Sequence, residues 1–137
     1  METPGDPRAT TPGGPLALII NPDGTAVLTP LPLNPATLST AVRELIGGHY
    51  QAIGAGRNGW IAYTAEDERE FPKGLPRNLQ ADAIARALGY RWDHGDCAKG
   101  VLVFLGRNGV DEADVPENVL SLARQAGIIP SPRGATP

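Results

Sequence analysis

The chain has 137 residues, a length that suits one domain and is too short for two of ordinary size. Its net charge is −3 and it contains no run of Lys and Arg, which weighs against nucleic acid as a partner. The single cysteine, Cys97, excludes an intramolecular disulfide, and the longest apolar runs fall far short of the roughly 20 residues of a membrane span. We therefore expect a cytoplasmic protein that makes no membrane contact.

Both ends of the chain are rich in Pro and offer almost no apolar side chain for burial. The sequence predicts disordered tails at residues 1–14 and 130–137. The first of these segments also lacks the basic start and the apolar stretch of a signal peptide. The ordered part is expected to be a single domain over residues 15–129.

The first ordered segment is predicted to be a hairpin followed by a helix. The apolar runs Leu16–Ile20 and Ala26–Thr29 flank Asn-Pro-Asp-Gly, residues that favour a turn. Asn34-Pro35 then combines a good N-cap with a proline at the first helical position. Apolar residues follow at helical spacing up to Ile46, and Gly47-Gly48 is expected to end the helix.

A second hairpin and a second helix follow. Residues 49–55 and 60–64 flank Gly-Arg-Asn-Gly, and Asn-Gly between two strand-like runs is a strong hairpin signal. Gly54 weakens the first of these strands and indicates a bulge. The helix is predicted over 79–88, with Asn78 as its N-cap. Its apolar face is expected to consist of Leu79, Ala83, Ile84, Ala87 and Leu88.

The last third of the chain contains a polar loop, a strand and a helix. Val101–Leu105 is continuously apolar, which predicts a strand buried on both faces. A second Gly-Arg-Asn-Gly turn is expected at residues 106–109. Asp114 and Glu117 resemble a capping box for the final helix, which Gly127 ends.

The predicted order of elements is β-β-α-β-β-α-β-α. Hairpins imply antiparallel pairing, so the predicted fold class is α+β. We expect a mostly antiparallel sheet of about five strands, with three helices packed on one face.

Several short motifs occur in an order that is similar to a known family. Leu45-Ile46-Gly47-Gly48 closes a helix directly before a strand, and an acidic segment later runs into Gly74-Leu75-Pro76-Arg77-Asn78, with Ala81 following. Gly95-Asp96 comes next, and Gly100 then opens an apolar strand. Over about residues 16–106 the chain resembles the domain of unknown function 3846 family of bacterial and phage proteins. Residues 69–72 depart from the family pattern by lengthening the link to the Gly-Leu-Pro element. The family has no assigned function, and the resemblance implies an accessory role of phage or plasmid type.

Residues Asp93, His94, Asp96 and Cys97 are all of metal-ligating type and lie within five positions. No second Cys/His cluster completes a site, so we favour a polar loop with Cys97 turned into the core, and we expect no metal and no cofactor. A thiol nucleophile that uses Cys97 with His94 or His49 is a further alternative, although no local signature of a thiol enzyme is present.

The acidic stretch that contains Glu66, Asp67, Glu68 and Glu70 has two interpretations. Adjacent carboxylates can share acid–base work or hold a cation. Four such charges close together are more often a solvated loop, and that is the interpretation we favour.

The candidate ligand-binding residues are basic side chains and one amide. Arg57 and Arg107 occupy the two identical Gly-Arg-Asn-Gly turns, and with Lys73 and Arg77 they are candidates for surrounding an anion. Asn78 joins this set because it precedes a helix N-terminus, which attracts anions.

The sequence therefore favours a non-enzymatic binding or interaction module whose partner is a protein or a small anionic ligand. The alternative is a small enzyme that uses His49 or His94 with Cys97 or Asp96. Unprotected sheet edges and a modest core favour a homodimer.

Overall fold

The computed structural model describes residues 14–54, 59–108, 111–128 and 130–132. Within these residues the strands are β1 (Leu16–Ile20), β2 (Ala26–Pro30), β3 (Tyr50–Ile53), β4 (Trp60–Ala65), β5 (Leu102–Asn108), β6 (Asp111–Ala113) and β7 (Ser131–Pro132). They form one sheet in the order β3-β4-β5-β1-β2-β7, and β6 pairs with the C-terminal end of β5. All neighbouring pairs are antiparallel except β2 and β7.

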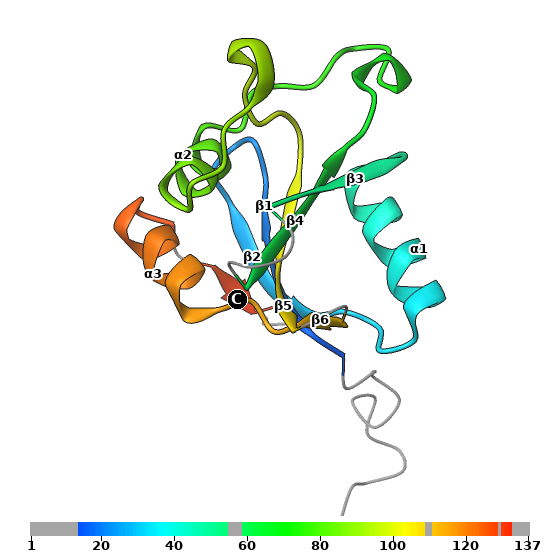
Figure 1. Cartoon of the computed structure of the whole chain (residues 1–137). Coiled ribbons are helices and arrows are strands. Elements are labelled where there is room, and N and C mark those ends of the chain that lie inside the picture. Colours follow the sequence, from blue (N-terminus) through cyan, green and yellow to red (C-terminus); the bar gives the residue numbers. More distant parts are fainter. Residues whose placement is uncertain (1–13, 55–58, 109–110, 129, 133–137) are drawn as a thin grey trace, which may run out of the picture.

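Within the described residues the helices are α1 (Pro35–Ile46), α2 (Leu79–Ala87) and α3 (Glu117–Gln125), with short 3-10 turns η2 (Glu68–Glu70) and η3 (Asp93–Gly95). The predicted α+β class is confirmed. Figure 1 shows α1 on one face of the sheet and α2 with α3 on the other. The expectation that all helices pack on one face is therefore wrong. β5 is apolar on both faces, and both faces need a cover.

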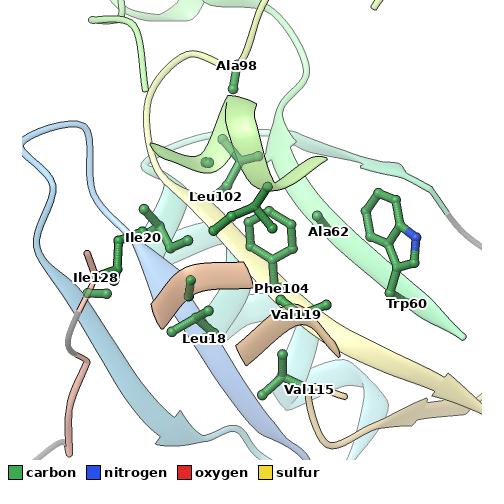
Figure 2. Packing of buried hydrophobic residues seen from close by; sticks show 14 of the residues in the cluster. Leu18, Ile20, Trp60, Ala62, Ala98, Leu102, Phe104, Val115, Val119 and Ile128 are labelled. Carbon is green, nitrogen blue, oxygen red and sulfur yellow. The ribbon is translucent and has the colours of Figure 1, made fainter. Parts of the chain in front are cut away.

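The core has two apolar layers, one on each side of the sheet. The layer under α2 and α3 is centred on Phe104 of β5 (Figure 2). The layer under α1 contains the other face of the same strand, including Val103. The four residues 102–105 have no exposed surface, which confirms the prediction of a strand buried on both faces.

The predicted hairpin between β1 and β2 and the predicted caps of α1 are confirmed. Leu18 pairs with Leu28 across the hairpin. The side chain of Asn34 accepts hydrogen bonds from the backbone N–H groups of Ala36 and Thr37 at 2.9 and 3.3 Å. Gly47 ends the helix in the left-handed conformation, with φ of 93°.

Gly54 follows β3 with φ of 71°, and there is no room for a side chain. A Cβ atom placed there would lie 2.1 Å from the indole of Trp60, which is 1% exposed. The turn at 55–58, which includes Arg57, lies outside the described residues. The glycine is required by the close approach of the buried indole and by its own positive φ.

Three predicted boundaries need correction. The sheet gains β6 and β7, which are too short to leave a clear sequence pattern. The predicted turn at 106–109 is wrong for its first three residues, because they continue β5 and pair with β6. Residues 131–132 pair with Val27 and Leu28 of β2, so this part of the predicted C-terminal tail belongs to the sheet. Most of both predicted tails lies outside the described residues.

The predicted capping box at α3 is wrong. Pro116 occupies the N-cap position and makes no side-chain cap. Asp114 instead accepts a hydrogen bond from the backbone N–H of Leu16 at 2.8 Å, at the start of β1. The carboxylate therefore connects the end of β6 to the start of β1, and it does not cap α3.

The buried face of α2 is shifted from the predicted one. The buried residues are Ala81, Ile84 and Ala85, whereas Leu79 is 66% exposed. Leu79 is the first residue of α2, and it does not lie on the face that Ala81, Ile84 and Ala85 bury.

A polar cluster lies on the α1 side of the sheet. Tyr63 of β4 donates a hydrogen bond to the carboxylate of Glu112 in β6, which also lies 3.9 Å from the guanidinium of Arg107. Burial, followed by the hydrogen bond to Glu112, raises the pKa of Tyr63 well above its ordinary value. The cluster joins β4, β5 and β6.

Candidate functional site

Asn78 positions the loops that surround the site. Its side chain has no exposed surface, and its oxygen accepts a hydrogen bond from the backbone N–H of Ala81 at 3.0 Å, as predicted for an N-cap. Its amide nitrogen donates to the carbonyls of Ile20 and Gly100 at 2.9 and 2.8 Å. One buried side chain thus joins the start of α2, the end of β1 and the segment that leads into β5.

Two loops meet at one end of the sheet because β4 and β5 are antiparallel neighbours. The segment after β4 and the segment before β5 therefore begin at the same edge. Figure 1 shows η2 and η3 at this end, at the top of the view. Leu75 packs 3.1 Å from the position that a Cβ at Gly100 would occupy, so the two segments also touch through apolar contact.

A polar cleft of about 240 Å³ lies between these loops. The sheet contributes Gln51 and Thr64, which are directly paired across β3 and β4. The last residue of β4, Ala65, also lines the cleft. The remaining lining comes from the two loops and consists of Glu66, Glu68, Leu75, Tyr90, Trp92, Asp93, Asp96, Cys97 and Lys99. Charged and aromatic side chains from segments far apart in the sequence converge in this cleft.

The charges of the cleft are mostly negative. Lys99 lies 3.2 Å from the carboxylate of Glu68 and 3.4 Å from that of Asp96. Glu66 and Asp93 have no cationic partner within the part of the chain that the structure describes. Four carboxylates against one ammonium group leave the cleft with a surplus of negative charge.

Asp96 is held ionised by its surroundings. The backbone N–H of Cys97 donates to its carboxylate at 2.9 Å, and this bond is the main reason that the pKa of Asp96 is lowered. Lys99 and Arg77 lower the pKa further. The loop itself is fixed to α2, because Asp82 accepts from the backbone N–H of Ala98 at 3.0 Å.

The aromatic side chains of the cleft form a pair. The rings of Tyr90 and Trp92 lie 4.7 Å apart between centroids, in an edge-to-face arrangement with an interplanar angle of 80°. The indole N–H of Trp92 is buried and has no hydrogen-bond partner among the described residues. Aromatic rings attract cations over their faces, so this pair and the carboxylates favour the same sign of ligand charge.

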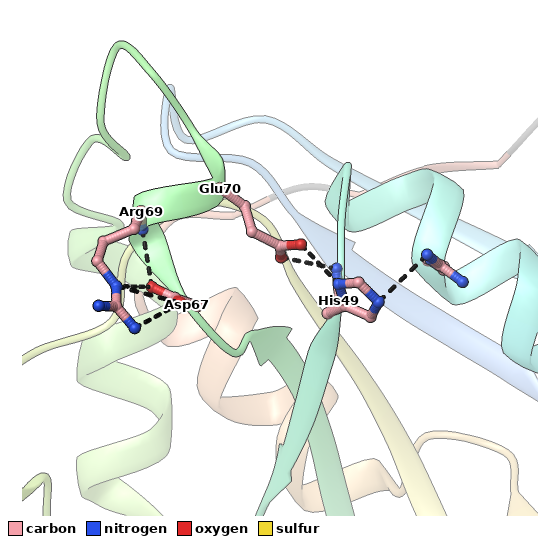
Figure 3. Close-up of polar contacts among 5 residues, drawn as sticks. His49, Asp67, Arg69 and Glu70 are labelled. Carbon is pink, nitrogen blue, oxygen red and sulfur yellow. Dashed lines mark hydrogen bonds and ion pairs between the residues drawn. The ribbon is translucent and has the colours of Figure 1, made fainter.

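His49 lies outside the cleft and has other partners. One ring nitrogen, Nδ1, is 2.5 Å from the carboxylate of Glu70, and the other, Nε2, is 3.3 Å from the guanidinium of Arg43 (Figure 3). The carboxylate of Glu70 also accepts from the backbone N–H of His49 at 3.0 Å. These contacts, chiefly the bond to the His49 ring, lower the pKa of Glu70. Phe71 packs beside them, 3.4 Å from the position of a Cβ at Gly47. The contacts of His49 with Glu70 and Arg43 connect η2 to the C-terminal end of α1.

Among the described candidates for an anion site, Arg107 lies apart from Arg77 and Asn78. Arg77 is exposed, and its backbone pairs with Lys99 beside the cleft. The side-chain oxygen and nitrogen of Asn78 are hydrogen-bonded to backbone groups. Lys73 is exposed and does not line the cleft. Arg107 lies near the other end of β5, about 17 Å along the strand from its start. Arg57 lies outside the described residues.

The metal and thiol sites that the sequence left as alternatives can be examined in the described residues. Among the described residues no group of three or more His, Cys, Asp and Glu side chains is arranged to hold a metal ion. Cys97 lines the cleft and is half-buried, so it is not turned fully into the core. His49 does not reach it, and the side chain of His94 lies outside the description. The pairing of Cys97 with His49 is therefore not formed.

Both acidic segments of the cleft are apparent in the sequence, but their association is not. The sequence also gives no sign that the cleft includes Gln51, Thr64, Tyr90, Trp92 and Lys99. The signal that joins them is the adjacency of β4 and β5. Asp67 and Glu70 belong to the same acidic stretch but face away, toward Arg69 and His49.

Comparison with protein-family models, curated proteins and solved structures finds no match for this chain. The resemblance to the domain of unknown function 3846 family stays a prediction. In the described part of the chain, no helix has the length and apolar character needed to cross a bilayer.

Proposed function

We propose that this protein is a non-enzymatic binding module whose cleft takes a positively charged group, an ammonium or a guanidinium. The observation that carries this proposal is the surplus of carboxylates around an aromatic pair, with Glu66 and Asp93 unpaired within the described residues. A desolvated cation gains from opposite charges and from the faces of aromatic rings.

The size of the cleft narrows the class of ligand. Pockets for drug-sized molecules occupy about 300 Å³ or more, whereas this cleft measures about 240 Å³. A small amine, or a Lys or Arg side chain of a protein partner, suits that volume. This sign of charge is opposite to that of the small anionic ligand expected from the sequence, because four carboxylates line the cleft together with one ammonium group.

Titration of tryptophan fluorescence with agmatine, a small molecule with both an ammonium and a guanidinium group, tests the proposal. Trp60 is buried away from the cleft lining, so a saturable change that disappears in Trp92→Phe reports the cleft. A short peptide with a central Arg, titrated in the same way, distinguishes a free amine from a protein side chain as the source of the cation.

Two variants with the same change of charge separate a local effect from a general one. Glu66→Gln removes a carboxylate from the cleft, whereas Glu44→Gln removes one from α1, on the opposite face of the sheet. We expect Glu66→Gln to weaken agmatine binding by about fivefold and Glu44→Gln to leave it nearly unchanged. Equal effects of the two variants, or saturable binding of inorganic phosphate instead of agmatine, contradict the proposal.

A further inference from the structure

Lys99 differs from the other residues of the cleft in being a cation. Its ammonium group lies between Glu68 and Asp96, at 3.2 and 3.4 Å, and its side chain is 30% exposed. Glu68 belongs to η2, whereas Asp96 and Lys99 both belong to the segment between η3 and β5. Lys99 is the one cation among the described residues that line the cleft, and its ammonium group joins the two loops.

We propose that Lys99 is an intramolecular competitor, whose ammonium group occupies the position that the ammonium or guanidinium group of a ligand takes when it binds. This inference rests on the proposed cation-binding function. A ligand cation that approaches Glu68 and Asp96 meets carboxylates whose charge is already partly compensated by Lys99. It must displace that ammonium group or share the carboxylates with it, and either event costs affinity.

The local backbone allows Lys99 to leave without disturbing the fold. The backbone around Lys99 is fixed by hydrogen bonds from Gly100 to Pro76 at 2.8 Å and from Asn78 to Ala98 at 2.9 Å. The ammonium group, by contrast, is at the end of a flexible four-carbon stem. Only side-chain torsions need to change for Lys99 to move toward solvent. Displacement of Lys99 has a free-energy cost that lowers the affinity of every cation. A ligand that makes further contacts in the cleft can offset this cost, whereas a simple monovalent cation cannot.

Replacement of the competitor tests the inference. Lys99→Gln removes the ammonium group, and Lys73→Gln is the control, since Lys73 is exposed and outside the cleft lining. We expect Lys99→Gln to tighten agmatine binding by about fivefold in the fluorescence titration and Lys73→Gln to change it less than about twofold. Circular dichroism checks that both variants keep the wild-type melting curve, since an exposed ion pair contributes little to stability.

The other outcomes separate the two proposals. Unchanged or weaker agmatine binding in Lys99→Gln, with wild-type binding intact, overturns the competitor role and identifies Lys99 as a structural tie or a contact for an anionic part of the ligand. The proposed function then stands. Absence of agmatine and Arg-peptide binding in the wild type and in both variants overturns the proposed function, and with it the competitor role.

Discussion

Replacement of Asn78 by Ala is expected to destabilise the protein much more than removal of an ordinary helix cap. The substitution leaves the N–H of Ala81 and the carbonyls of Ile20 and Gly100 without their partner, in a site with no exposed surface. Each unsatisfied buried polar group costs about 1–3 kcal/mol. Three such groups predict a loss of about 3–9 kcal/mol in the free energy of unfolding. Loss of an exposed cap predicts about 1 kcal/mol.

Asn34 provides the matched control, because it caps α1 with the same side chain at an exposed position. Urea denaturation followed by circular dichroism measures both variants. We expect Asn34→Ala to lose about 1 kcal/mol and Asn78→Ala to lose at least about 2 kcal/mol more, with the same dependence on urea. A failure of Asn78→Ala alone to fold agrees with the expectation, given total stabilities of about 5–15 kcal/mol. Equal losses for the two variants refute the role of Asn78 in joining the loops to β1.

Three further substitutions test local features. Gly54→Ala combines a positive φ with a clash against the buried indole of Trp60, and it should lower the free energy of unfolding by about 3 kcal/mol. Gly74 has a similar φ but open space around it, so Gly74→Ala should lower that free energy by about 1 kcal/mol. Thermal melts of the two variants measure the difference. The bond to His49 lowers the pKa of Glu70, so this contribution to stability is present above the ordinary pKa of 4.5 and is lost as the pH falls through the lowered value; Glu70→Gln should flatten the acid limb of a stability-against-pH curve. The raised pKa of Tyr63 makes its contribution complete below its ordinary pKa of 10.0 and lost as the pH rises beyond it, so Tyr63→Phe should weaken the alkaline pH dependence of urea unfolding.

Local features of the fold were predictable because their causes lie close together in the sequence. The cap at Asn34 bonds to residues two and three positions away, and a spacing rule is enough to find it. Asn78 was predicted as a cap for the same reason. Its other two partners lie 22 and 58 positions away, so its larger role depends on tertiary structure.

Helices cover both faces of the sheet, and this arrangement follows from the apolar run that forms β5. The run Val101–Leu105 predicts a strand buried on both faces, and such a strand requires a cover on both. The assignment of all helices to one face conflicts with that requirement. The sheet order, with β5 between β4 and β1, places the strand at the centre and makes the two-sided cover necessary.

The cleft was not predictable as a unit, although both acidic segments were noted. Glu68 and Asp96 are 28 positions apart, and only the pairing of β4 with β5 brings their loops together. The basic residues proposed for an anion site show the opposite case. Arg77 and Arg107 were grouped as candidates for one anion, but the length of β5 separates them.

Mapping of agmatine binding by amide and indole NMR spectra tests the central claim most directly. The account predicts chemical-shift changes concentrated at Gln51, Thr64 and the indole N–H of Trp92, with the resonances of β6 and of α3 unchanged. Saturation is expected at or below millimolar agmatine, the range of weak specific binding. Changes centred on another surface, or no change at the cleft up to that concentration, contradict a cation-binding role for this protein.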